Sequence, residues 1–218
     1  MTPDSLIFDM DGTLWDNVNS YVTVWNRALE NNGYEHRVSR TDLLALMGKE
    51  ARELLNTVLP DTNTTKQDQL FDNVIDEYQK LQGAMTPTVY EGVLEGLERL
   101  AAQYRLFLLS NCEEGGLVNF MNYTATAHLF EDYMEHGMNL KPKHHNLRLL
   151  IEKHGLQSPV YIGDTHSDAV QSAMANVPFV FVTYGFGDTE QFMLKFDSFP
   201  VLVDYFISLT PCTREGRG

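Results

Sequence analysis

LIFDMDGT, the sequence at residues 6–13, decides the fold that the rest of the chain has to follow. Its first three residues are apolar without alternation, which is typical of a short strand buried on both faces of a parallel sheet. The apolar run ends at Asp9, and Asp11 and Gly12 follow in a segment typical of a turn. A buried strand that ends in carboxylates places them at the edge of the sheet where open α/β folds bind ligands.

Short apolar runs of the same kind recur along the chain, and helix-like segments separate them. Residues 144–154 have apolar positions on one helical face, and residues 168–175 are rich in small residues suited to close helix packing. This alternation predicts an α/β protein with a doubly wound, Rossmann-like parallel sheet. The later strands are expected at residues 106–109, 160–162, 179–182 and 201–203.

Residues 16–87 depart from this alternation, because they show helical periodicity and no convincing strand. One amphipathic helix is marked by Val18, Tyr21, Val22, Trp25 and Leu29, and a second by Leu70, Val74, Tyr78 and Leu81. We therefore expect residues 16–87 to form an all-helical cap domain. It is inserted into a catalytic core made of residues 1–15 and 88–218.

Composition and charge narrow the classes of partner. Among 218 residues, 16 are basic and 30 acidic, giving a formal net charge of −14, which disfavours nucleic acid as a partner. No run of 18 apolar residues occurs and the first residues are acidic, so we expect a cytoplasmic protein without a membrane partner. Cys112 and Cys212 lack the spacing of a disulfide framework or zinc site. A monomer and a homodimer both remain open.

Polar residues follow three of the expected strands. The segments are Asp9–Thr13, Ser110–Asn111 and Gly163–Asp168, and they bring carboxylates, hydroxyls and an amide to one edge of the sheet. Carboxylates gathered there would repel one another unless a hard cation lay between them. Oxygen ligands beside an anionic substrate suit Mg²⁺, so the sequence predicts a magnesium site.

These residues also carry a family resemblance. Asp-x-Asp-Gly-Thr from Asp9, Ser110-Asn111, Lys141-Pro142 and Gly-Asp-Thr-x-x-Asp ending at Asp168 resemble, in order, the four motifs of the haloacid dehalogenase superfamily. The match spans residues 5–187, and the helical insertion is similar to the helical cap of the phosphoglycolate phosphatase and β-phosphoglucomutase branch. The resemblance implies a Rossmann-like core that performs phosphoryl transfer.

The resemblance also implies a role for each aspartate. Asp9 would be the nucleophile that forms an aspartyl-phosphate, and Asp11 the general acid and base. Magnesium would be held by Asp9, Asp164 and the backbone carbonyl of Asp11. Asp168 would orient that metal shell or the lysine; taken alone, it could equally be a helix cap.

The phosphate-binding residues implied by the resemblance are Ser110, Asn111 and Lys141. Lys141 is preferred because Pro142 follows it, whereas Lys143 is expected to be a solvated surface charge. The family often has a second proline where this chain has His144, so which of the two lysines contacts the phosphate is left open.

Together these features predict a Mg²⁺-dependent phosphomonoester phosphatase that acts on a small phosphorylated metabolite through an aspartyl-phosphate. Asp11 separates this activity from the dehalogenase branch, because a halide leaving group needs no proton. A phosphomutase of the β-phosphoglucomutase kind is the alternative, since it uses the same aspartates. A second and weaker alternative is a non-catalytic binding or regulatory module; it is weaker because every reacting group is present. The motifs do not determine the substrate.

Overall fold

The computed structural model describes residues 2–47, 51–60 and 62–209 of the chain, so Cys212 lies outside the described residues. By its internal contacts the chain divides into two compact units, one made of residues 1–15 and 89–218 and the other of residues 16–88. Each unit is described by itself.

The larger unit is built on a six-stranded sheet whose paired strands are all parallel, in the order β5-β4-β1-β6-β7-β8. The strands are β1 (Ser5–Phe8), β4 (Arg105–Ser110), β5 (Phe130–Glu135), β6 (Pro159–Gly163), β7 (Phe179–Val182) and β8 (Leu194–Phe196). Strand order runs outward from β1 in one direction and from β6 in the other. The expected doubly wound α/β fold is therefore confirmed, with its topological switch point at β1 and β6.

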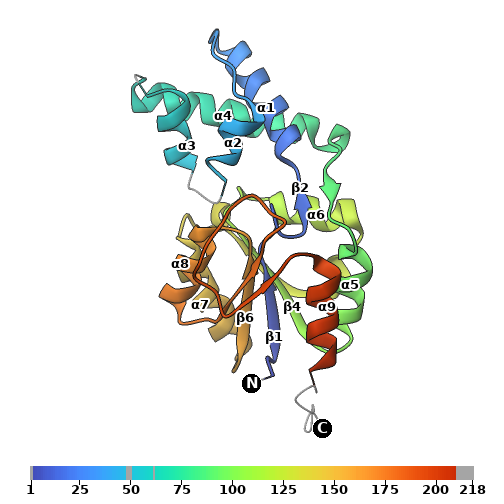
Figure 1. The fold of residues 1–218 in the computed structure, drawn as a ribbon. Coiled ribbons are helices and arrows are strands. Elements are labelled where there is room, and N and C mark those ends of the chain that lie inside the picture. The colour runs from blue at the N-terminus through green and yellow to red at the C-terminus, as the bar shows by residue number, and fades with distance from the viewer. Residues whose placement is uncertain (1, 48–50, 61, 210–218) are drawn as a thin grey trace. The chain divides into compact units, whose positions relative to one another are not determined.

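Alternate strand residues face opposite layers of helices. Leu6, Phe8 and Leu108 belong to one apolar core, whereas Ile7 and Phe107 belong to the other. Figure 1 shows α5 and α9 on one side of the sheet and α7 and α8 on the other. The helices of this unit are α5 (Val93–Ala101), α6 (Gly116–Thr124), α7 (Lys143–His154), α8 (His166–Ala175) and α9 (Phe199–Ser208), with short 3₁₀ turns η2 (Ala127–Leu129) and η3 (His136–Met138). With both faces covered, the strands show the unbroken apolar runs of the sequence.

The smaller unit consists mainly of helices. Its elements are α1 (Val18–Asn31), α2 (Arg40–Leu44), α3 (Ala51–Val58), α4 (Thr64–Leu81) and the 3₁₀ turn η1 (Gln82–Ala84). The two amphipathic helices expected from periodicity are confirmed as α1 and α4. Trp25 of α1 and Phe71 of α4 pack with their ring centroids 6.5 Å apart. Where the chain enters and leaves this unit, β2 (Trp15–Asp16) and β3 (Thr88–Val89) form a two-stranded sheet.

The expected strand at residues 201–203 is wrong, because these residues lie within α9. Pro200 lies in the first turn of that helix, and Leu202 and Val203 are buried while Val201 is 50% exposed. A run of three apolar residues fits a buried strand and a helix equally well, and the spacing of Phe199, Leu202, Val203 and Phe206 decides for the helix.

Two strands of the sheet were not expected from the sequence. β5 is an edge strand that carries Glu131, Asp132 and Glu135, so it has no apolar run, and β8 has only three residues. Two helices also begin earlier than expected: α7 starts at Lys143 and α8 at His166.

Among residues 2–47, 51–60 and 62–209, no helix is both long enough and apolar enough to cross a membrane.

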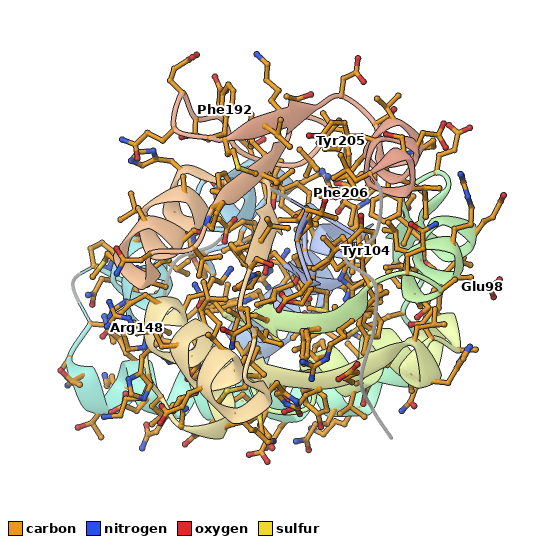
Figure 2. All side chains as sticks on the ribbon, turned by 90° about the horizontal axis from the view of Figure 1, so that it is seen from below. Glu98, Tyr104, Arg148, Phe192, Tyr205 and Phe206 are labelled. Carbon is orange, nitrogen blue, oxygen red and sulfur yellow. The ribbon has the colours of Figure 1, made fainter. Side chains whose placement is uncertain are left out.

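The packing of α9 gives a first prediction. The buried Tyr104 hydroxyl donates a 2.7 Å hydrogen bond to the carbonyl of Phe206, and Figure 2 shows the two side chains together. We expect Tyr104→Phe to lower the free energy of unfolding by about 1 kcal/mol, the typical contribution of one hydrogen bond, in urea denaturation.

Tyr205→Phe is the matched control for this variant. The Tyr205 ring also packs on Phe206, with the two ring centroids 5.3 Å apart. Within the described part of the chain, however, the Tyr205 hydroxyl makes no hydrogen bond like that of Tyr104. A loss in Tyr205→Phe as large as in Tyr104→Phe would contradict the role of the hydrogen bond.

Candidate active site

Asp9 lies at the centre of the site because it follows β1, the strand between β4 and β6. Its backbone amide donates a 2.8 Å hydrogen bond to the carbonyl of Ile162, which extends the sheet by one residue and fixes the direction of the side chain. The carboxylate is buried. Burial is the largest influence on the pKa of Asp9 and raises it, Lys143 lowers it, and the charge of Asp168 raises it; together these effects raise the pKa to about 7.

A tight turn follows Asp9 and carries Asp11. The carbonyl of Met10 accepts from the amides of Thr13 and Leu14 at 3.2 and 2.8 Å, and Gly12 supplies the left-handed φ of 84° that the turn requires. The indole of Trp15 donates a 2.9 Å hydrogen bond to Asp11 Oδ1. Asp11 is thus held two residues after Asp9 by a buried ring.

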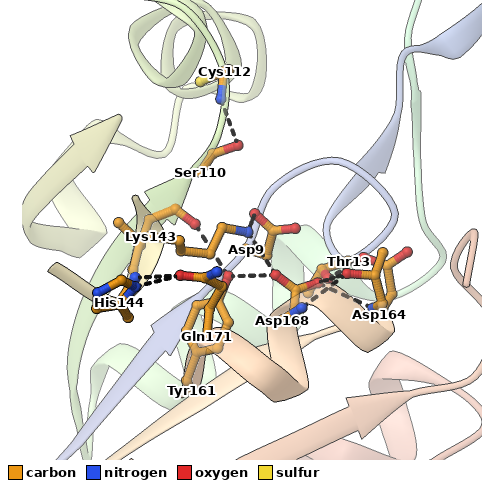
Figure 3. A network of polar contacts seen from close by, with 12 residues as sticks. Asp9, Thr13, Ser110, Cys112, Lys143, His144, Tyr161, Asp164, Asp168 and Gln171 are labelled. Atoms are coloured by element: carbon orange, nitrogen blue, oxygen red, sulfur yellow. Dashed lines mark hydrogen bonds and ion pairs between the residues drawn. The ribbon is translucent and has the colours of Figure 1, made fainter. Parts of the chain in front are cut away.

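Lys143 is the lysine that reaches Asp9. Its Nζ lies 3.1 Å from Asp9 Oδ1 and 2.6 Å from Asp168 Oδ1, and the residue is only 3% exposed. Burial acts to lower the pKa of Lys143, but the two carboxylates outweigh burial and raise it above the usual range. The ammonium is therefore charged, and Figure 3 shows it between the two carboxylates.

The preference for Lys141 and the expectation that Lys143 is a solvated charge are both corrected by this geometry. Lys141 is exposed, and its backbone carbonyl faces the ring of His136. The physical reason is where the helix begins. Pro142 is the extended N-cap of α7, so Lys143 is the first helical residue, whereas Lys141 precedes the helix in an exposed segment without regular secondary structure.

Asp168 holds Lys143 in place while it caps α8. Its Oδ2 accepts hydrogen bonds from the hydroxyl and the amide of Thr165 at 2.6 and 3.1 Å. Its Oδ1 accepts from Lys143 and, at 3.1 Å, from the hydroxyl of Tyr161. Burial would raise the pKa of Asp168, but Lys143 and these donors together lower it below its usual value. Asp168 is therefore ionised; it pairs with Lys143 and is the N3 residue of the capping box of α8, whose N-cap is Thr165.

Asp164 follows β6 and is fully buried. Thr13 donates a 3.2 Å hydrogen bond to its Oδ1, and the amide of Phe186 donates one of 2.7 Å to its Oδ2. Burial raises the pKa of Asp164 well above its usual range, and the charges of Asp168 and Asp9 add to this effect. The Phe186 contact is a site feature that sequence reasoning missed, since the pattern Gly185-x-Gly187 indicates only a loop.

The three buried carboxylates of Asp9, Asp164 and Asp168 each offer an oxygen within 4.8 Å of the others. One ammonium, that of Lys143, cannot neutralise all three, which is why burial and repulsion raise the pKa of Asp9 and of Asp164. Hard carboxylate oxygens with excess negative charge suit a divalent cation such as Mg²⁺. The oxygens of Asp168 are already occupied by Lys143, Tyr161 and Thr165, so Asp9 and Asp164 are the better ligands.

Ser110 is the last residue of the neighbouring strand β4, and Asn111 follows it. Phe8 of β1 pairs with Leu108 of β4, so Ser110 lies just beyond the level of Asp9 at the same edge of the sheet. Ser110 is buried, and its Oγ accepts a 3.4 Å hydrogen bond from the amide of Cys112. The structure thus brings Asp9, Asp164 and Asp168 into one cluster, in which Lys143 pairs with Asp9 and Asp168, and Figure 3 shows Ser110 near it. Lys141 is exposed.

The approach of Gly12 to Asp164 gives a second prediction. A Cβ on Gly12 would overlap the carboxylate of Asp164, and the backbone there has a φ of 84°. We expect Gly12→Ala to lower the free energy of unfolding by about 3–4 kcal/mol in urea denaturation, from left-handed strain and overpacking together.

Gly155→Ala is the control, because Gly155 also has a positive φ but a Cβ added to it would meet no atom within 4 Å. It should lose only about 1 kcal/mol, the cost of the backbone conformation. Equal losses in the two variants would show that the contact with Asp164 does not matter.

The ion pairs of Lys143 give a third prediction, which depends on pH. Lys143→Met keeps the apolar length but leaves Asp9 and Asp168 without their cation, so we expect about 3–5 kcal/mol lower stability at pH 8 in urea denaturation with a chelator present. Asp9 already has a pKa of about 7 in the folded state, against 3.8 for an unperturbed aspartate side chain. Removing Lys143 raises this folded-state pKa further. The variant therefore keeps its stability at low pH, where Asp9 is protonated, and loses it as the pH rises through the raised pKa. The loss of stability should be much smaller near pH 5 than at pH 8.

Lys141→Met is the control for charge removal at an exposed position, and it should change stability by less than about 0.5 kcal/mol at either pH. A loss in Lys143→Met that is the same at pH 5 and pH 8 would argue against buried carboxylates as its cause.

Comparison with known proteins agrees with this geometry. A phosphoglycolate phosphatase of Agrobacterium fabrum is 29% identical over 222 residues, covering 96% of this chain and 91% of the relative. A phosphoglycolate phosphatase of Aliivibrio fischeri is 27% identical over 196 residues, covering 85% of this chain and 86% of that protein.

A solved haloacid dehalogenase-like family hydrolase from Streptococcus pneumoniae superposes with a TM-score of 0.80 at 16% identity, covering 94% of this chain and 99% of the other, which shows a shared fold. The family model described as haloacid dehalogenase-like hydrolase matches residues 6–182. The resemblance inferred from the four motifs is confirmed, and the chain belongs to the haloacid dehalogenase-like hydrolases.

Proposed function

We propose that this hydrolase is a Mg²⁺-dependent phosphomonoester phosphatase that acts on a small phosphorylated metabolite. The observation that carries the proposal is the position of Asp9. Its carboxylate is buried at the end of the central strand, bonded to Lys143 and within reach of Asp164, with Asp11 two residues further on. The relatives named phosphoglycolate phosphatase support the same activity.

In the proposed first step, an Asp9 oxygen attacks the phosphorus of the ester and the bond from phosphorus to the leaving oxygen breaks. Asp11 gives its proton to the leaving oxygen, so the product departs as an alcohol. The hydrogen bond from Trp15 to Asp11 Oδ1 orients the carboxyl group for this transfer.

In the second step, Asp11 takes a proton from water as the water oxygen attacks phosphorus and the bond to Asp9 breaks. Lys143, Ser110 and Asn111 bind the phosphoryl oxygens through both steps, and Asp168 keeps Lys143 oriented. Asp9, Asp164 and the backbone carbonyl of Asp11 would hold Mg²⁺, and the bound ion would supply charge neutralisation on the phosphoryl oxygens.

Phosphoglycolate is the first substrate to test, because the relatives are named for it. We expect the purified protein to release phosphate from one or more members of a panel that contains phosphoglycolate, sugar phosphates and nucleoside monophosphates. Activity should require Mg²⁺, disappear with a chelator, and be poorly supported by Ca²⁺, whose longer bonds and looser geometry fit the site less well.

Asp9→Asn should reduce phosphate release about a thousandfold or more, because it removes the nucleophile. Asp4→Asn, just before the opposite end of β1, is the matched control and should keep wild-type activity. Near wild-type turnover in Asp9→Asn would exclude the covalent mechanism. Interconversion of sugar phosphates without phosphate release would instead indicate the phosphomutase.

A further inference from the structure

Glu135 is a buried carboxylate that the proposed mechanism does not use. It is the last residue of β5 and is 1% exposed. No lysine, arginine or histidine forms an ion pair with it in the part of the chain that the structure describes. A buried charge without a counter-ion is costly unless hydrogen bonds replace its hydration, so the partners of this carboxylate indicate what it does.

All of its recorded partners lie in the segment that follows Ser110. The amide of Gly115 donates to Glu135 Oε1 at 2.6 Å, and the amide of Leu117 donates to Oε2 at 2.9 Å. These are amides at the start of α6, which have no partner within the helix. Gly115, the N-cap of α6, has no side chain that could accept hydrogen bonds from these amides. Glu135, at the end of β5, accepts them instead and so caps the helix.

Cys112 connects this cap to Ser110. The Cys112 thiol lies 3.5 Å from Glu135 Oε2, and the Cys112 amide donates to Ser110 Oγ at 3.4 Å. Burial, together with the charges of Glu135 and Asp11, raises the pKa of the thiol, which therefore keeps its proton and can donate it to Glu135. Because Ser110 Oγ accepts from Cys112, its own hydrogen is available for another acceptor.

The backbone after Glu135 also contacts this segment. The amide of Gly137 donates a 3.2 Å hydrogen bond to the carbonyl of Cys112, and a Cβ on Gly137 would overlap the backbone of Glu114. Residues 112–117 are thus held along their length by residues 135–137.

We propose that Glu135 is a positioning residue, which fixes residues 111–117 so that Ser110 and Asn111 present their donors to a phosphoryl group. The proposal rests on the proposed function, because it assigns those two residues to phosphate binding. The amides of Gly115 and Leu117 bind the carboxylate of Glu135 and offset its negative charge.

Glu135→Gln tests the proposal. Glutamine offers one acceptor oxygen and an NH₂ group, so it cannot accept from both amides as the carboxylate does. We expect kcat/KM for a small phosphate ester to fall about 10- to 100-fold, as expected when phosphoryl donors are misplaced. The dissociation constant of inorganic phosphate, measured by calorimetry with Mg²⁺ present, should rise at least about tenfold, and hydrogen exchange in residues 111–117 should accelerate.

Glu131→Gln is the matched control, since Glu131 lies on the same strand but is exposed and pairs with Arg105 at 2.7 Å. It should change neither phosphate binding nor exchange in residues 111–117. Glu135→Asp keeps the charge but is one methylene shorter, and it should lie between wild type and Glu135→Gln in both measurements. If Glu135→Gln does not fold, Glu135→Asp is judged by the same criteria.

A variant that melts at lower temperature but binds phosphate within twofold of wild type would overturn the proposal, because Glu135 would then be structural only. Unchanged exchange in residues 111–117 would overturn it as well. A wild-type protein that neither binds phosphate nor hydrolyses any ester overturns the proposed function, and with it the phosphate-positioning role. Accelerated exchange in Glu135→Gln would then assign Glu135 to loop ordering alone.

Discussion

The buried ammonium of Lys143 is the group on which the arrangement of the site depends. It joins Asp9 at the end of β1 to Asp168 at the start of α8, and it comes from the first turn of α7. Three elements that are distant in sequence therefore meet at one nitrogen. Without this cation, carboxylates gathered within 4.8 Å would lie buried and uncompensated, and such an arrangement is strongly destabilising. The same ion pairs order the residues proposed for catalysis.

Around this centre, glycine residues let the backbone lie close to the buried carboxylates. A Cβ on Gly163 would lie 2.9 Å from the Asp168 carboxyl carbon, and Gly12 and Gly185 leave similarly little room beside Asp164. Amides and hydroxyls reach the acids at these places, as Phe186 and Thr13 do for Asp164. Hydrogen bonds within the protein therefore stabilise the negative charges of the site. A hydrolase of this family that binds a phosphoryl group needs such fixed donors, because they do not have to reorganise during the reaction.

Much of the fold could be predicted from local pattern. The apolar runs identified four strands because a strand covered on both faces must be apolar throughout, and α1 and α4 were identified because each buries one helical face. β5 and α9 could not be assigned in this way. An edge strand with three acidic residues has no apolar run, and three apolar residues at 201–203 do not distinguish a strand from a helix.

The sequence by itself determined which acids meet at the site, since Asp9 and Asp164 directly follow strands whose carboxyl ends share one edge and Asp168 lies in the first turn of the helix after β6. It also determined the family, through the order of four short motifs. Only the tertiary structure decided that Lys143 rather than Lys141 joins them, because the start of α7 selects which side chain turns inward. The same holds for Tyr161, Phe186 and Glu135, whose contacts bring together residues on different elements. Local sequence patterns indicate which residues are buried and where turns occur. Contacts between residues on different elements depend instead on how the helices pack on the sheet.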